Sequence, residues 1–276
     1  MADLCMTTRP GYTGQLNSRI LERIRVLADE LRLPHLEKRF PHLQVTDGSW
    51  RSPAAAAIAD DADLGEFIDH TQLKADADHS AFVRLCSEAA EHHFLAVAVN
   101  SAQVRRCVEL LRGTGVRVGG SVGFPLGQTT TSVKVAEALD EVANGALDMD
   151  MMLNVAELKN RNYAYVYEEI VAVCAACPPP VTTKVIFEVC LLTEEEIIDA
   201  AIMSIAAGAN FIKTSTGFST GGATPEAIDV MLAVAGNAAS VKASGGVRDR
   251  STALQYVRAG VRRIGTSAGV VICTPS

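Results

Sequence analysis

Short apolar runs rich in β-branched residues alternate with helical patterns from residue 64 onward, which predicts an α/β protein. The candidate strands are residues 67–69, 95–99, 117–122, 147–153, 183–187, 211–213, 240–243 and 263–265. The candidate helices between them are residues 80–91, 102–111, 132–144, 163–175, 193–207, 225–234 and 251–259. Strands joined by helical crossovers form parallel sheets, and eight such units predict a (β/α)8 TIM barrel. The competing fold, a doubly wound open sheet, favours a Gly-x-Gly-x-x-Gly turn after the first strand, and this chain has none there.

Glycines support the predicted boundaries of two helices. Gly208 in Ala206-Ala207-Gly208-Ala209 and Gly260 in Ala259-Gly260-Val261 each follow a helical pattern and precede a strand. Glycine is favoured just after a helix because it adopts the left-handed conformation without steric cost.

Residues 1–62 differ from the rest and predict a helical extension in front of the barrel. Apolar residues recur at helical spacing in residues 17–33, which predicts one amphipathic helix. Prolines and a glycine then punctuate a loop-rich stretch, and the alanine-rich run 54–59 predicts a short helix or a linker. The sequence therefore divides into an extension, residues 1–62, and a barrel, residues 63–276.

Composition narrows the class of protein. The chain has 276 residues, of which 48% are hydrophobic, and this supports a full core rather than a disordered chain. The net charge of −7 argues against a basic surface that binds nucleic acid. Glycine loops and helix N-termini still allow a local site for an anion. No apolar run is long enough to span a membrane, and the first ten residues do not resemble a secretory signal. Seven scattered cysteines favour reduced thiols, so we expect a cytoplasmic protein without a membrane or nucleic-acid partner.

Charged residues recur at alternate positions within two predicted strands. Lys184 lies within residues 183–187, and Asp148 and Asp150 share one face of residues 147–153. Since the outer face of a barrel strand must be apolar, these side chains are expected to point inward. Lys213 ends the strand at 211–213 and is expected to reach the mouth of the barrel, at the carboxyl ends of the strands.

A buried lysine beside a second cation suggests a nucleophile. Desolvation and a neighbouring positive charge both disfavour the ammonium form. A neutral amine can attack a carbonyl and form a Schiff base, which needs neither a metal nor another cofactor. The alternative that the pattern leaves open is a structural ion network inside the barrel.

Three glycine-rich segments follow the late strands and predict a phosphate site. They are Thr216-Gly217 through Gly222, Ser244-Gly245-Gly246-Val247-Arg248, and Gly265-Thr266-Ser267-Ala268-Gly269. In barrels, the loops after the last two strands often bind phosphate through backbone N–H groups. Tight turns are the alternative explanation. Cys174-Ala175-Ala176-Cys177 has no partner pair, and we interpret it as a helix end rather than a metal or redox site.

Taken in order, these segments resemble the deoxyribose-phosphate aldolase family of class I, Schiff-base aldolases, from about Asp69 to Gly269. The matching pieces are Asp69-His70-Thr71, Val122-Gly123-Phe124-Pro125-Leu126-Gly127, Gly145-Ala146 through Asp150, Lys184-Val185-Ile186-Phe187-Glu188, Phe211-Ile212-Lys213-Thr214-Ser215-Thr216-Gly217 and Lys242-Ala243-Ser244-Gly245-Gly246-Val247-Arg248. The resemblance implies a cytoplasmic carbon–carbon lyase of deoxyribonucleotide catabolism. It implies reversible cleavage of 2-deoxy-D-ribose 5-phosphate to D-glyceraldehyde 3-phosphate and acetaldehyde, and self-association as a dimer or tetramer.

The resemblance also implies roles for individual residues. Lys184 matches the Schiff-base lysine, and Asp150 matches the acid/base aspartate that works with a water. Lys213 matches the second lysine, which lowers the pKa of the first and assists proton transfer. The residues implied for substrate and phosphate binding are Thr216, Gly217, Lys242, Gly245, Gly246, Gly265 and Ser267.

Two alternatives remain open at this point. Departures from the family pattern at Ala98, Ser101, Leu147 and Ala268, together with the extension, are compatible with an aldolase-fold scaffold or binding partner with weak or no catalysis. Another phosphate-binding Schiff-base barrel, such as a transaldolase or a fructose-bisphosphate aldolase, is the third hypothesis.

Overall fold

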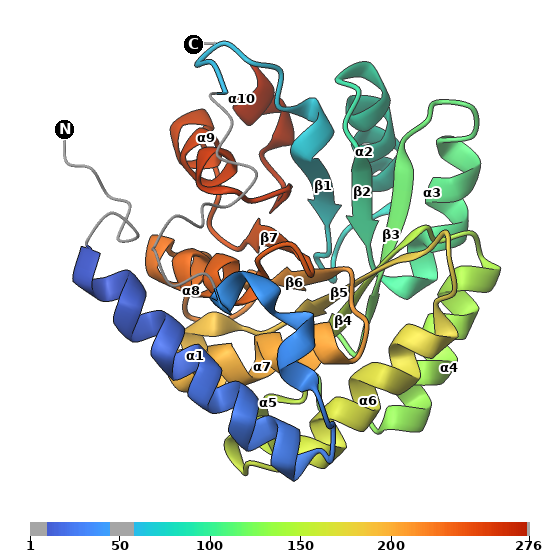
Figure 1. The fold of residues 1–276 in the computed structure, drawn as a ribbon. Helices are drawn as coiled ribbons and strands as arrows, with labels where there is room; N and C mark the ends of the chain where they lie inside the picture. Colours follow the sequence, from blue (N-terminus) through green and yellow to red (C-terminus); the bar gives the residue numbers. More distant parts are fainter. Residues whose placement is uncertain (1–9, 45–57, 275–276) are drawn as a thin grey trace.

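The computed structural model describes residues 10–44 and 58–274, and its centre is a closed barrel of eight parallel strands (Figure 1). The strands are β1 (Ile68–Gln72), β2 (Ala96–Val99), β3 (Arg117–Val122), β4 (Asp148–Met152), β5 (Thr182–Ile186), β6 (Phe211–Lys213), β7 (Ser240–Ser244) and β8 (Arg263–Thr266). Each strand pairs with the next along the chain, and β8 closes the ring against β1. The predicted TIM-barrel class is confirmed.

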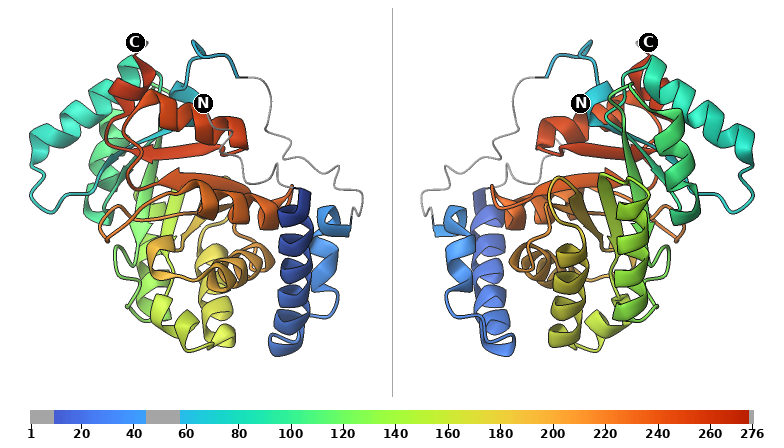
Figure 2. Two further views of the ribbon diagram at one scale, coloured as in Figure 1. Left: turned by 90° about the vertical axis from the view of Figure 1, so that its left-hand side faces the viewer. Right: turned by 90° about the vertical axis from the view of Figure 1, so that its right-hand side faces the viewer.

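Helices form a ring around the barrel (Figure 2). The helices of the ring are α2 (His79–Glu91), α3 (Val104–Leu110), α4 (Thr131–Ala143), α6 (Tyr163–Ala176), α7 (Glu194–Ala206), α8 (Pro225–Ala235) and α9 (Arg250–Ala259), with the short α5 (Val155–Lys159) and α10 (Gly269–Cys273). Short 3-10 segments occur at Leu36–Arg39, Pro41–Gln44, Gly65–Phe67, Ser101–Gln103 and Val189–Leu191. No helix in the described ranges combines the length and apolar character that crossing a membrane requires.

Among the predicted strands, the boundary that differs most from the structure is the end of the first one, which pairing extends. The first strand, predicted at 67–69, runs to Gln72 because Thr71 and Gln72 pair with β2. Helix α5 was not predicted; the Asn154 side chain starts it by accepting a hydrogen bond from the backbone N–H of Glu157 at 3.3 Å. Gly208 and Gly260 have φ values of +95° and +125°, as expected for helix-stop glycines.

The extension contributes one long helix, α1 (Pro10–Glu30), which lies along α7 and α8 (Figure 1). It begins and ends earlier than the predicted range 17–33. Its inward side chains are Leu16, Ile20, Ile24 and Leu27, all buried in the main core. The guanidinium of Arg23 also donates to both carboxylate oxygens of the buried Asp199, at 2.7 and 2.8 Å. Residues 54–57 of the alanine-rich run lie outside the described residues, and the division at residue 62 stays a prediction.

The interior of the barrel is polar, with small residues on one side and long charged residues on the other. The inward positions of β2 and β3 carry small residues, namely Ala96, Ala98, Gly119 and Ser121. The inward positions of β4, β5, β7 and β8 carry aspartate, lysine and arginine. Small side chains on one wall leave space for long side chains from the opposite wall. The apolar core lies instead between the strands and the helices.

Candidate active site

Asp150 binds three lysines at the centre of the barrel. One of its carboxylate oxygens is 3.0 Å from the Nζ of Lys184, and the other is 2.6 Å from Lys213 and 2.7 Å from Lys242. Strand register explains the convergence, because Lys184 pairs with Asp150 across β4 and β5, and Lys213 pairs with Lys242 across β6 and β7. All four side chains are buried; Lys184 is 0% exposed and Lys213 4%.

Asp148 lies two residues nearer the amino end of β4 and binds Lys184 together with two arginines. Its Oδ1 is 2.6 Å from the Nζ of Lys184 and 2.5 Å from Arg263, and its Oδ2 is 2.5 Å from the Nε of Arg117. Lys184 therefore bridges the two aspartates of β4.

Asp69 of β1 completes the cluster. Its carboxylate is 2.5 Å from the Nζ of Lys242 and 2.7 Å from Arg263. Since the four fully buried cations of this cluster outnumber its three carboxylates, the interior favours the loss of a proton or the arrival of an anion.

The surroundings shift the pKa values of these groups in opposite directions. Burial alone would raise the pKa of Asp150, but the three lysines bring it well below its usual range. Burial lowers the pKa of Lys213 to about 8, aided by Lys242 and Lys184 and opposed by Asp150. Burial works in the same direction on Lys242, yet Asp150 and Asp69 raise the pKa of this lysine above its ordinary value.

Of Lys213 and Lys242, Lys213 is therefore the lysine whose proton the structure makes easier to lose, which is compatible with the part in proton transfer that the family resemblance implies for it. A pKa of about 8 suits an amine that exchanges protons near neutral pH. The roles assigned to Lys184, Lys213 and Asp150 stay predictions, but the structure brings the three residues together in one group of ion pairs.

The glycines predicted to bind phosphate lie at the carboxyl end of the barrel, apart from one. Gly217, Gly245 and Gly246 have φ values of +85°, +85° and +82° and follow β6 and β7. In the described part of the chain, no acceptor binds the backbone N–H groups of these glycines or of the exposed Ser267. Gly265 differs because it lies within β8, where an added Cβ would come within 3.1 Å of the Lys242 side chain.

Two other predicted binding residues are engaged by carboxylates of the chain. The hydroxyl of Thr216 donates to Glu188, which sits at φ +58° after β5. The ammonium of Lys242 binds Asp69 and Asp150 in the interior, rather than standing free in the glycine loops. Lys242 therefore lies among the catalytic candidates, and its proposed contact with phosphate stays a prediction.

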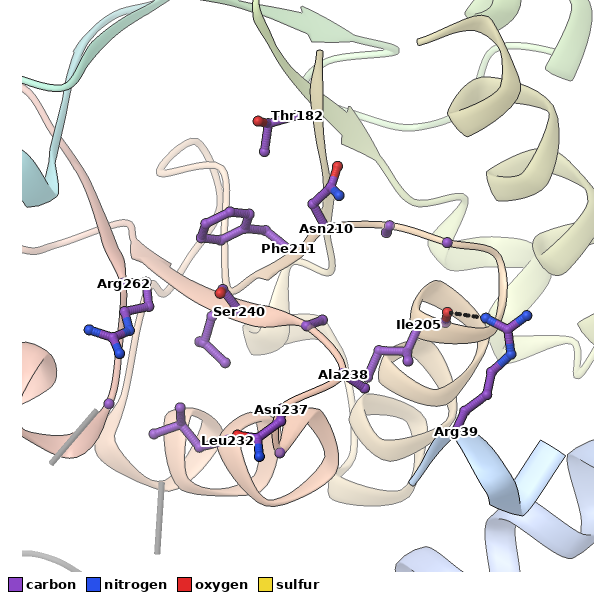
Figure 3. Close-up of a pocket in the computed structure, with 16 residues that line it drawn as sticks. Arg39, Thr182, Ile205, Asn210, Phe211, Leu232, Asn237, Ala238, Ser240 and Arg262 are labelled. Atoms are coloured by element: carbon purple, nitrogen blue, oxygen red, sulfur yellow. Dashed lines mark hydrogen bonds between the residues drawn. The ribbon is translucent and has the colours of Figure 1, made fainter. Parts of the chain in front are cut away.

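A cavity of about 770 Å³ lies at the amino end of the barrel, away from the mouth (Figure 3). It is lined by residues before and at the start of β5 to β8, such as Asn210 and Arg262, and by Arg39 of the extension. A cavity of about 430 Å³ at the mouth is lined by Met152, Glu188, Thr216 and neighbouring loop residues. We place the candidate site at the mouth, because active sites of this fold lie at the carboxyl ends of the strands.

Among the described residues, no group of three or more histidine, cysteine, aspartate or glutamate side chains is arranged to hold a metal ion. The three aspartates of the cluster are occupied by lysine and arginine donors instead.

Comparison with known proteins finds relatives along most of the chain. A family model described as DeoC/LacD family aldolase matches residues 65–273. The deoxyribose-phosphate aldolase of Brevibacillus brevis is 50% identical over 211 residues, which cover 76% of this chain and 95% of that protein. The deoxyribose-phosphate aldolase of Clostridium perfringens is 47% identical over 214 residues, 78% of this chain and 96% of that protein.

Solved structures give the same result. The crystal structure of a Coccidioides immitis protein, provisionally assigned as a deoxyribose-phosphate aldolase, is 34% identical with a TM-score of 0.76, and the match covers 97% of this chain and 98% of that one. The tetrameric deoxyribose-phosphate aldolase of Aeropyrum pernix is 31% identical with a TM-score of 0.71, over 76% of this chain and 89% of that one. The resemblance found in the sequence is thereby confirmed, and the chain belongs to the DeoC/LacD family of aldolases.

Proposed function

We propose that the protein is a class I aldolase that reversibly cleaves 2-deoxy-D-ribose 5-phosphate to D-glyceraldehyde 3-phosphate and acetaldehyde. The observation that carries the proposal is Asp150 binding the ammonium groups of Lys184, Lys213 and Lys242 at 2.6 to 3.0 Å inside the barrel. Such a group offers an amine for Schiff-base formation beside a second amine that exchanges protons near neutral pH.

The chemistry follows from these groups. The neutral amine of Lys184 attacks C1 of the open-chain sugar, and loss of water gives an iminium ion. Removal of the proton from the C3 hydroxyl breaks the C2–C3 bond, and the iminium takes up the electron pair as an enamine. Glyceraldehyde 3-phosphate leaves; protonation at C2 and hydrolysis of the iminium then release acetaldehyde and restore the lysine.

We assign the proton transfers to Lys213 with Asp150 and a water. The pKa of Lys213, about 8, suits exchange at neutral pH, and the carboxylate of Asp150 holds its ammonium at 2.6 Å. The phosphate of the substrate would accept hydrogen bonds from the backbone N–H groups of Gly217, Gly245, Gly246 and Ser267, which have no acceptor in the described part of the chain. Phosphate binding at that edge would fix the reacting carbons near Lys184.

The test is an assay of acetaldehyde release from 2-deoxy-D-ribose 5-phosphate, with Lys184→Ala as the inactive control. We expect turnover by the unmodified protein and none by the variant. Cleavage of ketose phosphates without cleavage of deoxyribose 5-phosphate would indicate a transaldolase or fructose-bisphosphate aldolase. No turnover of any sugar phosphate would favour the scaffold hypothesis.

Two further parts of the proposal concern the setting of the enzyme. We propose that the protein acts in the cytoplasm and that it self-associates, as its relative from Aeropyrum pernix does as a tetramer. Light scattering on the purified protein measures the second property directly, and a monomer at micromolar concentration would contradict it.

A further inference from the structure

The amine of Lys184 contacts both aspartates of β4. Lys184 pairs in register with Asp150, but its Nζ lies closer to Asp148, to which it donates a hydrogen bond at 2.6 Å, against 3.0 Å for the ion pair with Asp150. Asp148 is the first residue of β4, and Thr182, the first residue of β5, is its partner in register. Of the two carboxylates, the one closer to the amine is therefore on the residue farther from the carboxyl end of β4, where a substrate would enter.

Asp148 is itself held by two arginines. The Nε of Arg117 and an Nη of Arg263 each lie 2.5 Å from its oxygens. Arg117 is anchored in turn by hydrogen bonds to the backbone carbonyl of Leu147 and, at 3.1 Å, to the hydroxyl of Thr182. A buried carboxylate that accepts from three charged donors has little freedom to move, so Asp148 holds the Lys184 ammonium in a fixed position.

We propose that Asp148 is a positioning residue for the reaction. It holds the Lys184 side chain through a direct hydrogen bond, and its negative charge opposes the loss of the proton that must leave before the amine can attack the carbonyl carbon. That proton passes to the solvent, and the neutral amine is then free to bond to the substrate. This inference rests on the proposed function, because it concerns the lysine that forms the Schiff base.

The experiment measures trapping of Lys184 by acetaldehyde and borohydride as a function of pH. Asp148→Asn keeps the shape of the side chain and removes its charge. Because an opposite charge at this distance typically shifts proton affinity by about 1 to 3 pH units, we expect the midpoint of trapping to fall by about that amount. Asp69→Asn is the matched control, since Asp69 is equally buried but has no hydrogen bond to Lys184, and its shift should be smaller.

A second variant guards against a failure of Asp148→Asn to fold. Arg117 contacts Asp148 from a partly exposed position, with 26% of its side chain accessible. In Arg117→Met the negative charge of Asp148 is less neutralised and stabilises the Lys184 ammonium more strongly, so the midpoint pH of trapping should rise. In the Asp148→Asn background the same change should have little further effect, because the carboxylate through which Arg117 acts on Lys184 is absent.

The outcomes separate the inference from the function. Opposite shifts for Asp148→Asn and Arg117→Met support the positioning role. Unchanged midpoints in both variants, or a fall for Asp69→Asn as large as that for Asp148→Asn, would overturn it. If the unmodified protein forms no adduct on Lys184 at any pH, the proposed function itself fails.

Discussion

Replacing Lys213 with methionine should remove a defined pH dependence from the stability of the fold. Burial lowers the pKa of Lys213 from 10.5 to about 8, despite the carboxylate of Asp150 at 2.6 Å. The unfolded chain therefore binds this proton more tightly than the folded chain does. Methionine fills a similar volume and has no proton to bind, so Lys213→Met isolates the contribution of the amine.

The magnitude follows from the size of the shift. Each pKa unit corresponds to about 1.4 kcal/mol, so lowering the pKa from 10.5 to about 8 amounts to about 3 kcal/mol. Because the folded-state pKa is the lower one, the free energy of unfolding rises with pH between about 8 and 10.5, where the unfolded chain holds more protons. Between pH 7 and pH 10 the gain in the free energy of unfolding is about 2 to 3 kcal/mol.

Urea unfolding of the unmodified protein and of Lys213→Met, at several pH values between 7 and 10 and at constant ionic strength, gives the required comparison. Titrating groups that do not interact with Lys213 are common to both proteins and cancel in the difference between their free energies of unfolding. We expect that difference to move in favour of the unmodified protein by about 2 to 3 kcal/mol as the pH rises. Parallel curves would refute the claim that burial makes the Lys213 proton easier to lose.

Three further predictions concern the same barrel. Burial, reinforced by Glu137, raises the pKa of Glu141 to about 8, so the stabilising effect of its protonated form is lost as the pH rises toward 8. In urea unfolding, the free energy of unfolding of Glu141→Gln should therefore rise relative to that of the unmodified protein, by up to about 4 kcal/mol between pH 5 and pH 8. Gly120→Ala should destabilise the fold by a few kcal/mol, because the added Cβ would lie 1.9 Å from the Glu141 carboxylate, and Glu141→Ala in the same chain should recover part of the loss in thermal unfolding. Lys184→Ala should abolish turnover but retain the circular dichroism of the unmodified protein, and a loss of both would point to a structural role for this lysine.

Much of the catalytic group could be predicted from strand alternation. Asp148, Asp150 and Lys184 sit at alternate positions in strands whose other face must be apolar, and Lys213 ends a strand at the same end of the sheet. These local patterns place side chains inside a barrel without knowledge of its closure.

Residues contributed by the closure of the ring were missed. Asp69 seemed to end the first strand, because the pairing of Thr71 and Gln72 with β2 cannot be read from the sequence. Arg263 starts the last strand, and only the closure of β8 against β1 brings it to Asp69. Alternation within 263–265 was the one available signal, since Arg263 and the inward Gly265 share a face.

The pKa order of the lysines could not be predicted either. The sequence places Lys184 and Lys213 on neighbouring predicted strands, but the pKa of each buried lysine depends on which carboxylates its ammonium contacts. Lys242 binds two carboxylates and its pKa is raised, whereas Lys213 binds one and its pKa is lowered. Those contacts are set by strand register and side-chain length, which appear only in three dimensions.

Borohydride reduction in the presence of 2-deoxy-D-ribose 5-phosphate, followed by mass spectrometry of the peptides, tests the central claim most directly. We expect a single reduced adduct on Lys184 and none on Lys213 or Lys242. An adduct on Lys213, the lysine with a pKa of about 8, would show that the nucleophile has been assigned to the wrong amine. No adduct on any of the three lysines would contradict Schiff-base catalysis in this barrel.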